Sequence, residues 1–314
     1  DVTEDQIRTA LAEVMDPEIR RPITDLGMVD GITIDESTVT VHLLLTVAGC
    51  PLKDTLNRDI TAAVGTVTDS HSVVVEMGVM TDEQRKAMRE FLQGNRAEAE
   101  IPFTKPGSLT RVYAIASGKG GVGKSSLTVN LAAAMALNGL KVGIIDADIY
   151  GHSIPDMLGL GDQRPTQVDD MIMPVPAAVS PDKKASPDMK VMSMGMLKPR
   201  REQGIAWRGP MLDRALVQML SDVYWGDLDA LFLDLPPGTG DMAISLGQHL
   251  PNADFVVVTT PQQAAAQVAE RSGTMASMMH QRVVGVIENM SHLVLPDGST
   301  MEIFGSGGGE AVAT

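Results

Sequence analysis

The feature that most limits the folds open to this chain is a glycine-rich loop with the sequence Gly118-Lys119-Gly120-Gly121-Val122-Gly123-Lys124-Ser125. An apolar run, 112–116, leads directly into the loop, and a helical segment begins near Ser125. Between a strand and a helix, such a loop directs backbone N–H groups at phosphates, and the helix N-terminus adds partial positive charge. We therefore expect a P-loop in which Lys124 contacts the β- and γ-phosphates and the Ser125 hydroxyl binds Mg²⁺. The alternative is a glycine-rich turn with an incidental lysine.

Short runs rich in valine, isoleucine and leucine alternate with helical segments after residue 110. Their ranges are 112–116, 142–145, 230–235, 255–259 and 283–287. Continuous apolar runs of this length are typical of parallel strands that are covered on both faces. We therefore predict an α/β fold with a doubly wound, mostly parallel sheet for a P-loop NTPase domain over residues 111–314. Because a helix begins after three glycines close to Thr314, we expect this domain to continue beyond that residue.

A smaller α+β domain is predicted for residues 1–92. Thr3 and Gln6 have the spacing of a capping box and precede apolar residues at helical intervals, which predicts a helix that ends near Asp16. The segments that we predict to follow are a strand at 38–46, a helix at 52–64 and a strand at 72–77.

Two segments lack a regular apolar period. Residues 93–110 combine glycine, proline and scattered charges, which indicates a linker between the domains. Residues 171–188 contain four prolines, and we predict an irregular surface excursion there. A length of 314 residues fits a division into two domains of roughly 100 to 200 residues each.

Aspartates follow two of the predicted strands. Asp146 and Asp148 come after the run at 142–145. Asp234 closes the apolar stretch at 231–233, just before a segment rich in proline and glycine. The carboxyl edge of a parallel sheet is where ligands bind. Asp234 therefore has the placement of a Walker B carboxylate that binds Mg²⁺. Asp146 or Asp148 could instead cap the following helix.

Lys119 follows the first glycine of the loop, where the general P-loop pattern requires no lysine. The string from Lys119 to Ser125 resembles the deviant Walker A motif of the MinD/ParA class. In that class the early lysine reaches the partner's nucleotide across an ATP-sandwich dimer. The resemblance thus implies a homodimer in which Lys119 acts like an arginine finger, although the residue could also be a solvated loop lysine.

The same resemblance implies roles for other residues at the sheet edge. Asp148 would orient or deprotonate the attacking water, and Asp146 would lie near the metal together with Ser125 and Asp234. Asn289, which follows the run at 283–287, would hydrogen-bond the adenine ring, although a turn residue is an equal alternative. The nucleotide-binding residues that we expect are Gly118, Lys119, Gly120, Gly121, Val122, Gly123, Lys124, Ser125, Ser126 and Asn289.

Longer strings narrow the resemblance to the Mrp/ApbC iron-sulfur cluster carriers. In the second half of the chain they are Asp146-Ala147-Asp148-Ile149-Tyr150-Gly151, Trp207-Arg208-Gly209-Pro210-Met211, Tyr224-Trp225-Gly226-Asp227 and Glu288-Asn289-Met290-Ser291. In the first half, Asp16-Pro17-Glu18, Asp25-Leu26-Gly27 and Gly49-Cys50-Pro51 resemble the small iron-sulfur assembly domain that precedes the ATPase in many of these carriers. The resemblance implies an ATP-hydrolysing dimer that binds iron-sulfur clusters and delivers them to apo-proteins, or assists their assembly with other factors.

One departure from this family concerns cysteine. The carriers usually have a Cys-x-x-Cys pair shortly after the Glu-Asn-Met-Ser string, but residues 292–298 contain none, so the standard bridging cluster cannot form. His292 and Asp297 are harder ligands in that segment, or simply solvated side chains. Cys50 is the one cysteine of the chain, and with Lys53 and a helix N-terminus nearby we expect a lowered thiol pKa and an iron-sulfur ligand. A buried, inert thiol is the alternative.

Without the cysteine pair, a second function stays open, namely a metal-free regulatory or positioning ATPase of the MinD/ParA type that acts on a protein or membrane partner. The formal net charge of -15 disfavours nucleic acid as a partner, because such binding depends on cationic side chains. A single cysteine fits a reducing cytosol, and no apolar run approaches the roughly 20 residues that cross a bilayer. We therefore expect a cytoplasmic protein.

Overall fold

The computed structural model describes residues 2–50, 52–68, 70–93, 100–149, 151, 153–179, 189–197, 209–238, 241–262, 267–269, 271 and 281–314. The chain divides into two compact units. The small unit comprises residues 1–99 and 165–174, and the large unit comprises residues 100–164 and 175–314. Residues 165–174, which fall within the predicted NTPase domain along the sequence, thus group with the small unit.

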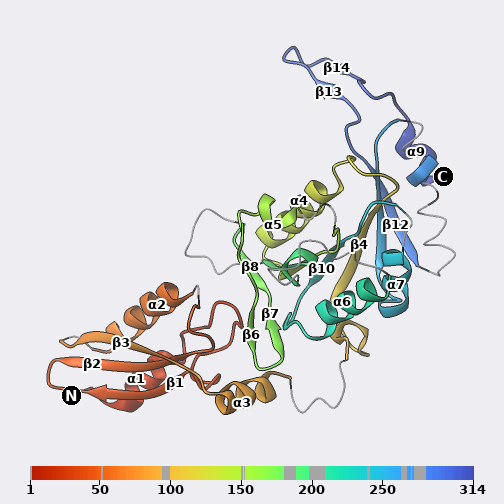
Figure 1. Ribbon diagram of the computed structural model, residues 1–314. Helices are drawn as coiled ribbons and strands as arrows, with labels where there is room; N and C mark the ends of the chain where they lie inside the picture. Colours follow the sequence, from red (N-terminus) through yellow and green to blue (C-terminus); the bar gives the residue numbers. More distant parts are fainter. Residues whose placement is uncertain are drawn as a thin grey trace. The chain divides into compact units, whose positions relative to one another are not determined.

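The small unit is built on a three-stranded sheet with the order β1-β2-β3 (Figure 1). Its strands are β1 (Val29–Ile34), β2 (Thr38–Leu45) and β3 (Ser72–Val79), and its helices are α1 (Glu4–Leu11), α2 (Lys53–Gly65) and α3 (Asp82–Gln93). Strands β2 and β3 are parallel, and α2 connects them. The predicted strands and the helix between them are confirmed, whereas β1 and α3 were not predicted.

Helix α1 begins as its sequence predicts. The Thr3 hydroxyl accepts a hydrogen bond from the Gln6 N–H, and the Gln6 side chain accepts one from the Thr3 N–H, so both partners of the capping box are present. The helix ends at Leu11, earlier than the predicted end near Asp16. Ile7 and Leu11 are fully buried, which explains why the apolar period marks this segment.

The prediction of an irregular excursion at 171–188 is wrong for the residues that the structure describes there. Strands β6 (Thr166–Val168) and β7 (Met171–Met173) form an antiparallel hairpin that belongs to the small unit, and β8 (Val175–Ala177) joins the main sheet. Most side chains of β7 and β8 are buried. Pro176 is tolerated because β8 is an edge strand. Residues 180–188 lie outside the described part of the chain.

The large unit contains a seven-stranded sheet with the order β12-β11-β4-β10-β5-β9-β8. The bounds of its strands, apart from β8, are β4 (Arg111–Ser117), β5 (Val142–Asp146), β9 (Met189–Ser193), β10 (Ala230–Asp234), β11 (Asp254–Thr259) and β12 (Arg282–Glu288). All neighbouring strands are parallel except β8 and β9. The five predicted strands and the mostly parallel sheet are confirmed.

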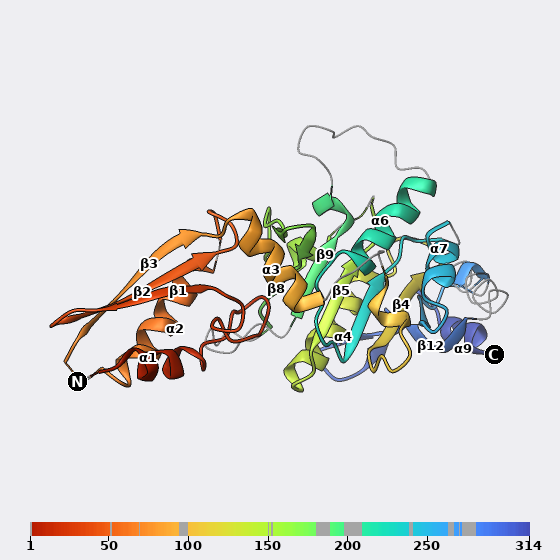
Figure 2. The same cartoon turned by 90° about the horizontal axis from the view of Figure 1, so that it is seen from below.

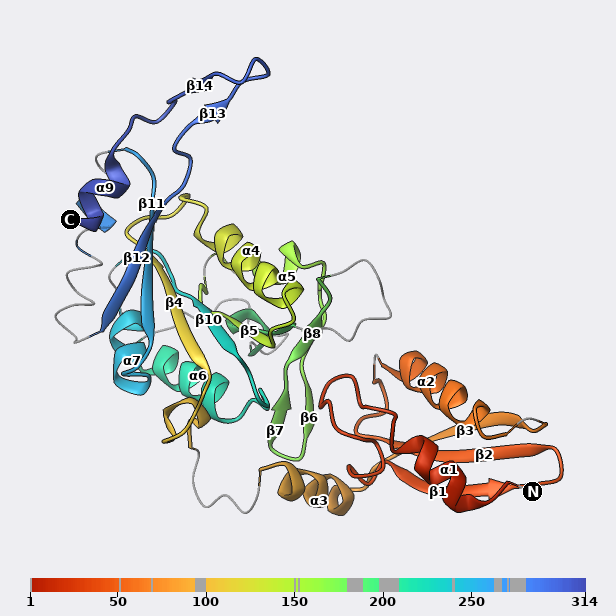
Figure 3. The ribbon, with the colours of Figure 1, turned by 180° about the vertical axis from the view of Figure 1, so that it is seen from behind.

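Helices cover both faces of this sheet, as Figures 2 and 3 show for α4 on one face and α6 and α7 on the other. The bounds are α4 (Lys124–Leu137), α5 (Ile154–Met157), α6 (Gly209–Ser221), α7 (Asp241–His249) and α9 (Gly308–Ala313), with single 3-10 turns η1 (Pro102–Thr104) and η2 (Met194–Leu197). Apolar residues of β4, β5 and β10 are buried between these layers. The doubly wound α/β prediction is therefore confirmed.

Two smaller features complete the large unit. A hairpin of β13 (Leu293–Val294) and β14 (Thr300–Met301) follows β12. Phe103 of η1, within the predicted linker, is only 8% exposed.

No helix among the described residues is both long and apolar enough to cross a membrane.

The sheet order places three sequence motifs at one edge. Strand β10 lies between β4 and β5, and Asp234 pairs in register with Ile115 on one side and with Asp146 on the other. The glycine-rich loop follows β4 at the same carboxyl edge. In parallel sheets this is the edge at which ligands bind.

Candidate functional site

The glycine-rich loop connects β4 to α4, and space and backbone conformation both require glycine within it. Gly121 and Gly123 have φ values of 78° and 82°, a left-handed conformation that glycine adopts without strain. A Cβ atom at Gly118 would lie 2.4 Å from the carbonyl carbon of Val268, and one at Gly123 would lie 2.3 Å from Nδ2 of Asn289. The loop is thus held closely by later parts of the chain. Val122 is 2% exposed, so its side chain anchors the loop in the core.

Lys124, Ser125 and Thr128 of α4 meet Asp234 at the end of β10. Lys124 Nζ donates to Asp234 Oδ1 at 2.6 Å, and Ser125 Oγ donates to Oδ2 at 2.6 Å. Thr128 Oγ1 lies 3.1 Å from Oδ1. Asp234 is fully buried and Lys124 is 6% exposed, so the charges compensate each other in a dry environment. The structure thereby brings the predicted Walker A and Walker B residues together.

Thr128 was missed by the sequence reasoning. It lies one helical turn after Lys124, and its hydroxyl also bonds the Lys124 carbonyl oxygen at 2.9 Å. The spacing of four residues, which places two side chains on one helix face, is the signal that could have found it.

Asp146 is buried beside Asp234, with several donors directed at its carboxylate. Oδ1 accepts the Asp148 N–H at 3.3 Å, and Oδ2 accepts the Ile154 N–H and the Ser193 hydroxyl, both at 3.4 Å. Burial, followed by the negative charge of Asp234, raises the pKa of Asp146 to about 7. The hydrogen bonds act in the opposite direction but are weaker. The site therefore concentrates negative charge where a cation would relieve it.

Asp148 turns back onto the following loop. Its Oδ1 accepts the Gly151 N–H at 3.1 Å, and the side chain is nearly buried. The helix-cap alternative applies better to Asp146, since that residue accepts the N–H of Ile154, the first residue of α5. The role of Asp148 toward the attacking water stays a prediction.

Lys119 is held within its own chain in this structure. Its Nζ donates to Oε1 of Gln262 at 3.0 Å, just beyond the end of β11. Gln262 was not among the predicted site residues. Its position at the carboxyl edge of a strand next to β4 could have marked it.

Asn289 and Ser126 border the loop from two sides. Asn289 Nδ2 donates to the Val122 carbonyl oxygen at 2.9 Å, so its amide supports the loop backbone. Ser126 is exposed, and its hydroxyl lies 4.0 Å from Sδ of Met157. Contact of either residue with a nucleotide stays a prediction.

The expectation of a lowered thiol pKa at Cys50 is wrong. The residue is half-buried, and burial together with the negative charges of Glu18 and Asp16 raises the pKa of the thiol. A hydrogen bond from the Leu52 backbone, which lowers the pKa, does not outweigh these effects. The two carboxylates come from a distant part of the sequence, which is why a local reading that considered only Lys53 failed.

The predicted metal ligands do not form a dense cluster. Within the described residues, no group of three or more His, Cys, Asp or Glu side chains is placed to bind a metal. His292 and Asp297 are exposed on the β13–β14 hairpin, where Asp297 accepts the Ser299 N–H at 2.9 Å and its hydroxyl at 2.6 Å. Asp297 is thus a turn residue.

Comparisons with known proteins agree with this geometry. Residues 108–314 match the family model described as NUBPL iron-transfer P-loop NTPase, and residues 4–77 match the model described as iron-sulfur cluster assembly protein. An iron-sulfur cluster carrier protein of Mycobacterium tuberculosis is 57% identical over 308 residues, which cover 98% of this chain and 78% of the relative. A protein of the same name from Deinococcus radiodurans is 40% identical over 306 residues, which cover 97% of this chain and 80% of the relative.

Among solved structures, the chain is similar to a nucleotide-binding protein in complex with ADP from Archaeoglobus fulgidus. The two are 36% identical with a TM-score of 0.53, and the match covers 64% of this chain and 75% of the other. The resemblance predicted from the sequence is thereby confirmed for both parts of the chain. By its matches over 108–314 and along nearly its whole length, the chain belongs to the NUBPL iron-transfer P-loop NTPase family and carries an iron-sulfur cluster assembly domain before the NTPase.

Proposed function

We propose that this protein is an ATP-hydrolysing dimer that binds iron-sulfur clusters and delivers them to apo-proteins, or assists their assembly with other factors. The observation that carries the ATPase part is the buried group of Lys124, Ser125 and Asp234 behind the glycine-rich loop. The names of the relatives support the cargo. The reaction is the hydrolysis of ATP by water to ADP and phosphate.

The donor set fits Mg²⁺, which prefers hard oxygen ligands and keeps several waters beside one or two carboxylates. The Ser125 hydroxyl and the Asp234 carboxylate would hold the ion, and Asp146 lies next to them with a pKa raised to about 7 in the absence of a cation. When bound, the ion would supply positive charge that partly neutralises the phosphates of the nucleotide. We expect few protein ligands to Mg²⁺ at this site, because the nucleotide and water molecules would supply the others.

The chain's own residues have distinct parts in hydrolysis. Lys124 turns from Asp234 toward the β- and γ-phosphates, where its charge stabilises the transferring group. Asp148 orients or deprotonates the attacking water. Lys119 leaves Gln262 and acts on the partner's nucleotide when ATP closes the dimer. In the single chain Lys119 Nζ donates to Gln262, so the trans role requires this hydrogen bond to break when the dimer closes.

The cluster is cargo, and this chain offers one thiol for it. Cys50 is half-buried and lies near the carboxylates of Glu18 and Asp16, and both effects raise the pKa of its thiol, so the thiolate forms less readily at neutral pH than at an exposed cysteine. A dimer would contribute two Cys50 thiolates to a cluster shared with a client or an assembly factor. Such a labile site suits transfer better than storage. We further propose that the protein works in the cytoplasm.

Two measurements test the proposal. ATP turnover should fall severalfold in Lys119→Ala at saturating ATP, while affinity for ATP stays unchanged, because the lysine acts on the transition state in trans. Turnover at the wild-type rate would refute the trans role. Anaerobic reconstitution of the full chain should give iron that Cys50→Ser loses, with iron-dependent activation of an apo-protein that follows the same difference.

A second function has a specific observation in its favour. The missing cysteine pair, together with the raised pKa of Cys50, fits a metal-free switch that uses the ATP-dependent dimer on a protein or membrane partner. Absence of iron after reconstitution, combined with ATP-dependent dimerisation, would favour this function over the carrier.

A further inference from the structure

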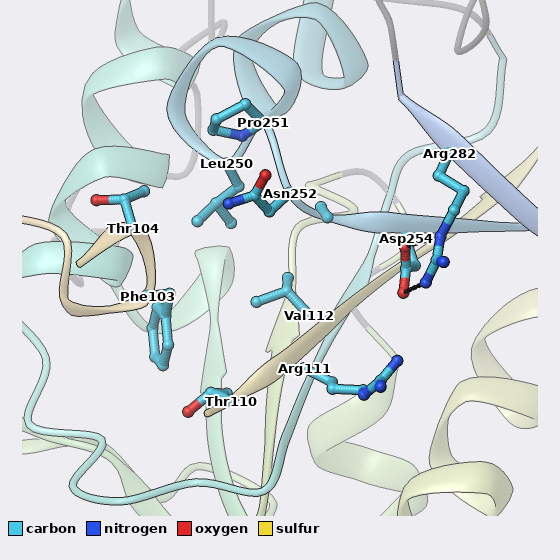
Figure 4. Close-up of a pocket in the computed structure, with 11 residues that line it drawn as sticks. Phe103, Thr104, Thr110, Arg111, Val112, Leu250, Pro251, Asn252, Asp254 and Arg282 are labelled. Carbon is cyan, nitrogen blue, oxygen red and sulfur yellow. Dashed lines mark hydrogen bonds and ion pairs between the residues drawn. The ribbon is translucent and has the colours of Figure 1, made fainter. Parts of the chain in front are cut away.

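A pocket of about 430 Å³ lies in the large unit, at the sheet edge opposite the glycine-rich loop (Figure 4). Its lining includes the first residues of three adjacent strands, which are Arg111 of β4, Asp254 of β11 and Arg282 of β12. Its volume falls within the range of ligand-binding pockets, roughly 300 to 1,000 Å³. Because the motifs for nucleotide binding lie at the carboxyl edge, the function described above does not use this pocket.

One half of the pocket is apolar. The side chains of Phe103, Val112, Leu250 and Ala253 line it and are each at most 8% exposed, so they form a floor that is already packed. Figure 4 shows Val112 and Asn252 pointing toward the open space that Phe103 and Leu250 border. An apolar side chain of moderate size could lie on this floor.

The other half is cationic. Arg282 binds Asp254 through two hydrogen bonds of 2.8 Å, which neutralises that carboxylate. Arg111 is exposed and, within the described part of the chain, has no carboxylate within ion-pair distance. Among the described residues that line the pocket, two arginines and one aspartate leave one positive charge, although the formal net charge of the chain is -15. In Figure 4 Arg111 extends to the side of Val112 on which the Asp254–Arg282 pair lies.

We propose that this pocket docks a short segment of a partner protein in which an apolar side chain stands next to a carboxylate. The apolar side chain lies on the floor at Phe103, Val112 and Leu250, and the carboxylate binds Arg111. Among the described residues that line the pocket, Arg111 is the charged group without an ion-pair partner. Charge complementarity therefore selects a carboxylate, which arginine binds in a planar, two-pronged geometry. The location leaves the carboxyl edge of the sheet open, so segment and nucleotide bind together.

Labelled octapeptides and the full-length chain test this docking site by fluorescence anisotropy, with ATP present. The probe contains one leucine followed by one glutamate in a background of glycine and serine, and two matched peptides replace either glutamate by glutamine or leucine by serine. We expect about two- to fivefold weaker binding without the carboxylate, the range for an exposed ion pair. Without the leucine, we expect about tenfold weaker binding.

Variants of the chain separate the two halves of the pocket. Arg111→Gln should abolish the preference for glutamate over glutamine, and Asn252→Trp should abolish the preference for leucine by filling the space over the floor. The matched control is Arg58→Gln, an exposed arginine of the small unit that should change neither preference. All three variants should keep the wild-type ATPase rate, which also shows that they fold.

The proposal would be overturned if the glutamate and glutamine peptides bound with equal affinity, or if Arg111→Gln left the preference for glutamate unchanged. It would also be overturned if no peptide bound up to millimolar concentration, or if acetate bound as tightly as the peptide. Competition between the peptide and ATP would contradict the proposed location. A failure of the ATPase proposal looks different, because Lys124→Ala would then hydrolyse ATP normally whether or not the peptides bind.

Discussion

Asp146 offers a stringent test of the electrostatics at the site, because its buried carboxylate lies beside that of Asp234. In the folded protein its pKa is raised from 3.8 to about 7. The folded state therefore holds a proton that the unfolded state releases between these pH values. Stability from this group is constant below about pH 4, falls by about 1.4 kcal/mol per pH unit up to pH 7 and is constant above it. The total loss is about 4 kcal/mol.

Replacement by asparagine removes this pH dependence. The asparagine side chain has no charge to bury, but its amide nitrogen would face the Ile154 N–H, so one hydrogen bond is lost at a cost of about 1 to 3 kcal/mol. We therefore expect Asp146→Asn to be less stable than the wild type at pH 4 and more stable at pH 8, by roughly 1 to 3 kcal/mol in each case.

Urea unfolding at a series of pH values measures the effect, with EDTA and without nucleotide so that no bound cation shifts the titration. The fluorescence of Trp225, which is 2% exposed, reports on the large unit. Asp162→Asn, an exposed aspartate of the same unit, is the matched control and should leave the pH profile unchanged. A constant difference between Asp146→Asn and the wild type from pH 5 to 8 would refute the reasoning.

Three further predictions concern the same edge of the sheet. Lys124→Ala should abolish ATP binding in calorimetry, and an intact affinity would contradict the P-loop assignment. It should also destabilise the nucleotide-free protein by about 3 to 5 kcal/mol, because the buried Asp234 loses its cationic partner. Thr128→Val keeps the side-chain shape but removes the hydroxyl, whose one hydrogen is shared between Asp234 Oδ1 and the Lys124 carbonyl oxygen. Urea unfolding should show a loss of about 1 to 3 kcal/mol, whereas a change below about 0.5 kcal/mol would show that the hydroxyl contributes little. Asp148→Asn should stop hydrolysis in a phosphate-release assay and spare ATP binding, and a parallel loss of both would instead assign the residue a structural part through Gly151.

Much of the large unit could be predicted because its signals are local. A buried strand needs a continuous apolar run, and the runs at 112–116, 142–145 and 255–259 correspond to β4, β5 and β11. The loop between β4 and α4 needs glycine for its left-handed φ values, so its position was also visible. The capping box of α1 is local in the same way.

Other elements escaped prediction because their stability comes from distant contacts. Strand β9 was not predicted because Lys190 breaks its apolar pattern. In the fold Lys190 is only 8% exposed, and its ammonium group donates to the Trp225 carbonyl oxygen at 3.1 Å. Strand β1 includes Asp30 and Gly31, which are rare in strands, and is stabilised by pairing with β2.

The sequence by itself determined that the chain has a phosphate-binding loop, a parallel sheet and a single thiol, because each depends on residue type and short spacing. Only the tertiary structure decided what these residues face. It joined Asp234 to Lys124, 110 positions apart in the chain, and it put Lys119 against Gln262. It also half-buried Cys50 and placed the carboxylates of Glu18 and Asp16 near it, where the sequence suggested positive charge. Electrostatic energy depends on distance in space and on burial, and both are set by the fold.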